Sequence, residues 1–170
     1  MIWVTFRCNM TKSKMIEKQI KALQSMKGLT VEAGWFDSTR YPSETGGEGM
    51  LVSEVARLNE FGHIAVLNFG QGPVRVEVPP RPFMRYAYEL FVSERSEIEN
   101  KIAKKIFSGK IDARQALGQI GLAMEAKIVE SIKNGPWQPN ARYTVRVKGF
   151  DKPLIHTSLM WQSVSSQVIK

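Results

Sequence analysis

The stretch Pro-Pro-Arg-Pro-Phe-Met-Arg at residues 79–85 decides where the longest expected helix begins. Its three prolines lack a backbone N–H and hold φ near an extended value, so the chain is not helical before Arg81. Pro82, by contrast, suits the first turn of a helix. Apolar residues then recur with a helical period as far as Phe107, where a Ser-Gly pair interrupts the pattern. The stretch therefore predicts an extended strap followed by a helix over residues 82–107.

A second helix follows after a short turn. Asp112 suits its N-cap, and one apolar stripe continues to the Asn-Gly step at residues 134–135. Two long helices joined by a short glycine turn favour an antiparallel hairpin. The expected core couples a stripe from each helix. These stripes are Leu117, Ile120, Met124, Ile128 and Ile132 on the second helix, and Leu90, Ile98, Ile102 and Ile106 on the first.

A related signal, Asn-Glu-Phe-Gly-His, stands upstream at residues 59–63. Apolar residues from Met50 to Phe61 lie on or near one helical stripe, and Gly62 supplies the left-handed residue that ends such a helix. Neither this phrase nor the proline-rich one holds a nucleophile, a metal cluster or a phosphate cradle. Both phrases indicate geometry and not chemistry.

The rest of the chain predicts further strands and helices around the hairpin. Alternating apolar residues indicate strands over residues 2–7, 29–36, 74–78 and 163–169, and a strand or extended arm over 141–147. Helices are expected from Thr11 or Ser13 to about Lys27 and over residues 153–161. The first helix is expected to pack across the sheet formed by its two flanking strands. Residues 37–49, rich in Ser, Thr, Pro and Gly, indicate a long loop of the kind that often carries function.

These expectations define an α+β fold. A small, mostly antiparallel sheet carries helices on one face, and residues 1–170 form one domain with an extended loop and a C-terminal arm. The length of 170 residues is enough for a core without disulfides or metal, and the single Cys8 has no internal disulfide partner. An apolar run of about 18 residues, as a membrane span requires, is missing from the sequence.

The net charge of +8 is concentrated at the two ends of the chain. Residues 1–27 carry six basic groups against one Glu, and residues 140–170 carry five against one Asp, so the middle is nearly neutral. Such asymmetry favours an acidic partner, either DNA or an acidic protein surface, although a solvated helix face and a polar tail fit the pattern equally well. Lys14, Lys18 and Lys21 form the candidate basic docking face.

Catalytic and metal-binding patterns fit the sequence poorly. His63 and His156 are more than ninety positions apart, whereas zinc ligands usually come in close pairs. Asp151, His156 and Ser158 lie close together, but without a G-x-S-x-G elbow they indicate local capping and not a nucleophilic triad. The Gly-rich run at 46–49 lacks the Lys-Ser/Thr of a phosphate loop. We therefore expect neither an enzyme nor a cofactor.

Protein contact is the more promising role for the unusual residues. Trp137 stands between prolines, where it either anchors an interface or packs under its own loop. The strap at 79–85 either docks with little loss of entropy or clamps the long helix to the sheet. The candidate interface residues are Asn59, Glu60, Phe61, Pro80, Arg81, Pro82, Phe83, Trp137, Pro139 and Asn140.

Five motifs in a fixed order carry a family resemblance. They are Gly-Trp-Phe at 34–36, A-x-x-N-E-F-G at 56–62, P-P-R-P-F at 79–83, G-x-W-x-P-N at 135–140, and K-P-L-I at 152–155 followed by Ser-Val at 163–164. In this order the chain resembles the virion-morphogenesis or tail-completion proteins of tailed bacteriophages, which include minor tail protein Z-like neck proteins. The resemblance extends from about Leu29 to the C-terminus. His156 and Ser158 depart from it, because the family usually has Asp and Gly there.

The resemblance implies a non-enzymatic structural protein of the virion, assembled in the host cytoplasm. Such a protein forms a homo-oligomeric ring, six- or twelve-fold, at the head–tail neck. The ring completes the tail and joins it to the connector, so its partners are portal-side proteins and tail tube proteins, and DNA passes through its lumen. The alternative from another class is a small nucleic-acid-binding regulator that uses the basic first helix. Neither an aromatic stacking platform nor a helix-turn-helix signature supports that alternative.

Overall fold

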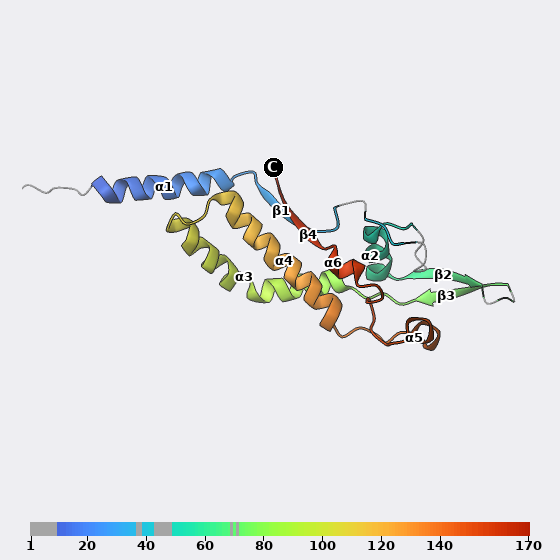
Figure 1. The fold of residues 1–170 in the computed structure, drawn as a ribbon. Helices are drawn as coiled ribbons and strands as arrows, with labels where there is room; N and C mark the ends of the chain where they lie inside the picture. The colour runs from blue at the N-terminus through green and yellow to red at the C-terminus, as the bar shows by residue number, and fades with distance from the viewer. Residues whose placement is uncertain (1–9, 37–38, 43–48, 69, 71) are drawn as a thin grey trace, which may run out of the picture.

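A computed structural model describes residues 10–36, 39–42, 49–68, 70 and 72–170 (Figure 1). The elements in chain order are α1 (Met10–Met26), β1 (Thr30–Gly34), α2 (Val52–Phe61), β2 (His63–Asn68), β3 (Pro73–Val78), α3 (Phe83–Phe107), α4 (Ala113–Asn134), α5 (Arg142–Lys148), α6 (Leu159–Gln162) and β4 (Ser165–Ile169). Helices and antiparallel strands together confirm the predicted α+β class.

The described strands form two separate sheets of two strands each. β1 pairs with β4 from Thr30↔Ile169 to Gly34↔Ser165, and β2 pairs with β3 as a hairpin from His63↔Val78 to Asn68↔Pro73. The strand expected at residues 2–7 lies outside the described residues. The expected small antiparallel sheet is thus divided, and the β2–β3 hairpin extends away from the helices (Figure 1).

Helix α4 covers the β1–β4 sheet (Figure 1). Gly121 lies at this contact, and a Cβ atom there would come within 2.5 Å of the Ser166 Oγ, so the absence of a side chain permits the close approach. The expectation that the first helix packs across the sheet is wrong. Helix α1 instead extends past the sheet toward the turn between α3 and α4, where the Gln19 side chain donates a hydrogen bond to the Phe107 carbonyl.

The predicted helical hairpin is confirmed, because α3 and α4 pack against each other. Asp112 caps α4 as expected. Its carboxylate accepts a hydrogen bond from the Gln115 amide at 2.8 Å, and the Gln115 side chain accepts one from the Asp112 amide at 3.0 Å. This reciprocal pair satisfies two amides that would otherwise lack a partner at the helix start.

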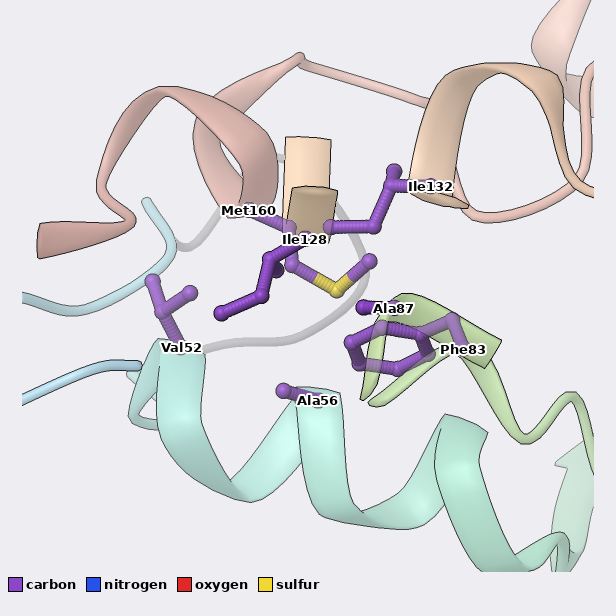
Figure 2. Close-up of a cluster of buried hydrophobic side chains, with 7 residues drawn as sticks. All are labelled: Val52, Ala56, Phe83, Ala87, Ile128, Ile132 and Met160. Atoms are coloured by element: carbon purple, nitrogen blue, oxygen red, sulfur yellow. The ribbon is translucent and has the colours of Figure 1, made fainter. Parts of the chain in front are cut away.

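The main core lies where α2, α3, α4 and α6 meet (Figure 2). It consists of Val52, Ala56, Phe83, Ala87, Ile128, Ile132 and Met160. A second cluster of Ile102, Ile106 and Ala116 joins the other ends of α3 and α4. The predicted stripes therefore enter the core through Leu117, Ile128, Ile132, Ile102 and Ile106, whereas Ile120, Met124, Leu90 and Ile98 are only half-buried.

Two local predictions near the C-terminus are wrong. Residues 141–147 were expected as a strand or arm, but Ala141 is the N-cap and residues 142–147 belong to helix α5, which Gly149 ends in the left-handed conformation. The helix expected over 153–161 is reduced to α6, since Leu154 and Ser158 adopt positive φ values of 61° and 65°. Strand β2 was not among the expected elements. Most of the expected loop at 37–49 lies outside the described residues, but its ends are joined by a bridge between Arg40 and Leu51.

Candidate protein interface

The strap before α3 is held by Arg81. Its backbone amide donates to the Asn59 carbonyl at 2.8 Å, and its guanidinium Nε and Nη2 donate to the Gln138 carbonyl at 3.4 and 3.3 Å. Arg81 is only 6% exposed. Through its backbone amide and its buried side chain together, Arg81 thus ties the end of α2 to the loop after α4, which brings three of the sequence motifs together.

Burial lowers the pKa of Arg81, and the charge of Asp151 opposes this effect. Burial also lowers the pKa of Lys148, the charge of Arg81 lowers it further, and Asp151 again opposes. The two cations therefore belong to one electrostatic cluster, in which positive charge is incompletely compensated.

Several candidate interface residues hold the fold together. The Glu60 carboxylate accepts hydrogen bonds from the Met84 and Arg85 amides at 2.8 and 3.4 Å, so it caps the start of α3, with Pro82 at the N-cap position. Phe83 is 0% exposed and lies in the core (Figure 2), which removes it from any external surface. Its inclusion among the interface candidates is corrected accordingly.

Trp137 packs under its own loop. Its indole N–H donates to the Ser131 carbonyl at 2.9 Å, and its ring meets the edge of Tyr86 with centroids 5.7 Å apart. A Cβ atom at Gly135 would lie 2.4 Å from this indole, so the glycine leaves room for it. Of the two readings of Trp137, local packing is the one that these contacts describe.

The other candidates lie at the surface. Phe61 is 70% exposed, Pro80 is also exposed, and Asn59 and Pro139 line a groove. Asn140 lines the same groove, and both its backbone amide and its side chain donate to the Asp151 carboxylate, at 3.0 and 2.9 Å. Asn140 thereby joins the two ends of the segment that contains α5.

The groove is an open, mainly apolar hollow of about 950 Å³. Helix α2, the inner face of the β2–β3 hairpin, helix α5 and residues 154–156 surround it. The apolar part of its wall includes Val55, Leu58, Ala65, Leu67, Val76, Val147, Leu154 and Ile155. A hollow of this size and composition is typical of a binding site.

Two further apolar surfaces lie at opposite ends of the molecule (Figure 1). On α1, Ile16, Ile20 and Leu23 recur at helical spacing and are about half exposed. On the outer face of the hairpin, Ile64 and Val66 are 65% and 62% exposed. The second surface was missed with strand β2, whose sequence signal is the short apolar run from Ile64 to Leu67. Burial alternates along this run, but its residue types do not, so the sequence did not show which face is exposed.

The candidate basic face lies on α1. Lys14, Lys18 and Lys21 are exposed and share one side of the helix. Each apolar residue of the Ile16 stripe follows a lysine of this face by two positions, or about 200° around the helix axis. The lysines and the apolar stripe therefore occupy nearly opposite sides of α1.

The described residues contain no group of three or more His, Cys, Asp or Glu side chains placed to hold a metal ion. Nor does any helix in the described ranges have the length and apolar character of a membrane span. Comparison of the chain with protein-family models, with curated proteins and with solved structures finds no match.

Proposed function

We propose that this chain is a non-enzymatic structural subunit of a phage virion that forms a ring at the head–tail neck. In this role it completes the tail and joins it to the connector. The family resemblance of the five sequence motifs supports the location. The placement of unlike apolar surfaces on α1 and on the β2–β3 hairpin is the observation that supports a ring.

The argument for a ring is geometric. A helix stripe at one end of a subunit and a strand face at the other are different surfaces, so they fit a head-to-tail contact between copies. Head-to-tail contacts produce closed rings when the rotation between subunits closes. Apolar residues that are about half exposed on α1 and more exposed on the hairpin would be buried by that contact, which stabilises it.

The proposed ring has six or twelve copies and lies between portal-side proteins and tail tube proteins. DNA passes through its lumen without sequence-specific binding. The lysine face of α1 is available for an acidic neighbour, because its side chains are exposed on the side away from the apolar stripe.

Negative-stain imaging and light scattering of the purified protein test this function. We expect rings of six or twelve subunits. Monomers or closed dimers at concentrations up to those found in assembling particles would overturn the proposal.

A mixing experiment tests the contact itself. Ile20→Asp places a charge on the α1 stripe and Ile64→Asp places one on the hairpin, so each variant alone should lose the ring. A mixture retains one intact pair of surfaces and should stop at the heterodimer. Tyr88→Asp, which changes an exposed residue of α3, is the matched control and should still form rings.

The exposed lysines of α1 favour a second candidate, the nucleic-acid-binding regulator. Its signature is a salt-sensitive dimer on DNA, whose affinity falls steeply with salt as counterions are released. A DNA-bound dimer in place of a free ring would decide for this candidate.

A further inference from the structure

The groove beside the β2–β3 hairpin has an excess of positive charge. Arg81, Arg142 and Lys148 line it, and Glu77 is the acidic residue of its described lining. Asp151 lies nearby, where its Oδ1 atom accepts two hydrogen bonds from Asn140 and its charge acts on both Arg81 and Lys148, so three cations stand against two carboxylates.

The two more buried cations bind only neutral acceptors in the described structure. The Arg81 guanidinium donates to the Gln138 carbonyl at 3.3 and 3.4 Å, and the Lys148 Nζ donates to the Lys152 carbonyl at 2.6 Å. Neither forms a salt bridge with a described residue. A cation removed from water is stabilised most by an anion. The charge of Asp151 acts on both cations but forms a salt bridge with neither, so a second carboxylate in contact with them is still favoured.

Apolar side chains stand close to these charges. Leu58 of α2, Val76 of β3 and Leu154 line the same hollow as Arg81 and Lys148. In the described part of the chain β2 and β3 pair only with each other, so each keeps one free edge, and an extended segment along such an edge gains backbone hydrogen bonds. The hollow thus offers apolar contacts and a cationic site within one surface, next to a hairpin whose strand edges can pair with an extended segment.

We propose that this groove binds an extended protein segment in which a carboxylate side chain is flanked by apolar residues. The carboxylate lies against Arg81 and Lys148, and its apolar neighbours lie against the side chains of α2 and the inner face of the hairpin. The assignment of this segment to a neighbouring protein of the neck rests on the proposed function. The chemistry of binding rests only on the groove.

Nucleic acid fits this surface less well. Its phosphates are closely spaced and favour a continuous basic track, whereas the groove wall is mainly apolar. One or two cations in an apolar setting match an isolated carboxylate better.

A library of random nonapeptides displayed on a carrier provides the probe. Selection on the full-length protein should enrich peptides with Asp or Glu between apolar residues. The best peptide should bind about tenfold more tightly than its counterpart with Asn or Gln at the acidic position, as expected for a charge-assisted hydrogen bond.

Lys148→Met should weaken the acidic preference, because Arg81 remains as the only one of the two cations, while the protein still folds since the Lys148 side chain is only half-buried. Lys110→Met, which removes the same charge from an exposed turn, should leave selection and affinity unchanged. The inference would be overturned if the wild type selected no peptide or selected peptides without an acidic preference. An unchanged acidic preference in Lys148→Met would overturn it as well. Displacement of the peptide by a short single-stranded oligonucleotide would also overturn it.

Peptide binding and ring formation are separate readouts. A protein that binds acidic peptides but forms no ring retains the groove inference and loses the proposed function. A protein that forms a ring but binds no such peptide retains the proposed function and loses the groove inference.

Discussion

Gly62 joins α2 to β2 in a conformation that other residues rarely adopt, with φ 73° and ψ 162°. A Cβ atom there would lie 2.9 Å from both the Pro80 backbone N and the Val78 carbonyl oxygen. Neither neighbour is a flexible side chain, so the clash cannot be relieved by rotation about a side-chain bond. The glycine that ends the helix also allows the strap to pass close to it.

Gly62→Ala should therefore lower the free energy of unfolding by about 3 kcal/mol, at the upper end for a strained backbone. Gly149→Ala is the matched control, because Gly149 also has positive φ but no atom within 4 Å of the added Cβ. Its cost should be nearer 1 kcal/mol. Urea denaturation of both variants measures the difference, and equal losses would show that the Pro80 contact is unimportant.

Glu60 provides a second residue-scale test. Its carboxylate accepts from two amides at the start of α3, so Glu60→Ala should cost about 1–2 kcal/mol, as for other helix caps. Glu89→Ala removes an exposed carboxylate from α3, the helix that Glu60 caps, and should change stability little. If the two variants have the same midpoint of urea denaturation, the Glu60 cap contributes nothing to stability.

At the residue scale, sequence reasoning recognised the unusual positions but could not assign their partners. Glu60 and Trp137 stood out as interface candidates, yet one caps a helix twenty-four positions away and the other packs beside Ser131 and Tyr86. A rigid motif looks the same in sequence whether it contacts another protein or its own fold. Only the tertiary structure separates the two.

At the element scale, one face of α4 is buried in the core and the other is exposed. Ile128 is 4% exposed between α2, α3 and α6 (Figure 2), whereas Leu122 on the same helix is 61% exposed. Ile128→Ala should cost about 2–5 kcal/mol, through lost burial and the cavity left behind. Leu122→Ala should stay within about 0.5 kcal/mol of the wild type. Thermal unfolding distinguishes them, and similar melting temperatures would place Ile128 outside the core.

The elements that sequence predicts well are those with strong periodicity and clear ends. α3 and α4 combine a long apolar period with a proline start, an Asp112 cap and glycine ends, so several signals agree. Residues 142–148 show the opposite case. Their alternation indicates a strand, but the described structure has no partner strand beside them. They form a helix of seven residues instead.

At the scale of the whole molecule, the fold class was predictable and the arrangement was not. Both α1 and α4 have amphipathic patterns that suit the β1–β4 sheet. The close approach of α4 is permitted by Gly121, which lies forty-five positions from its neighbour Ser166. Because local patterns carry no information on such distant contacts, the pairing of β1 with β4 and the extension of α1 past the sheet appear only in the structure.

The extended α1 gives the last prediction, which concerns its lysine face. Lys14, Lys18 and Lys21 are exposed on the side away from the apolar stripe, so they remain available when that stripe is buried in a ring. We expect them to attract an acidic protein surface. That attraction is screened over a Debye length of about 8–10 Å near physiological salt. DNA binding should be weak and non-specific.

Changing the three lysines together to Gln should therefore leave folding and ring formation intact but reduce the joining of heads to tails. The control changes Lys104, Lys110 and Lys170 to Gln, which removes the same charge from exposed sites elsewhere. Particle joining, DNA retention and melting temperature are measured separately. Loss of DNA retention with normal joining would assign the face to DNA. Normal joining and normal DNA retention in the α1 variant would mean that the three lysines form only a solvent-exposed helix face, because removal of their charge would then have affected neither partner.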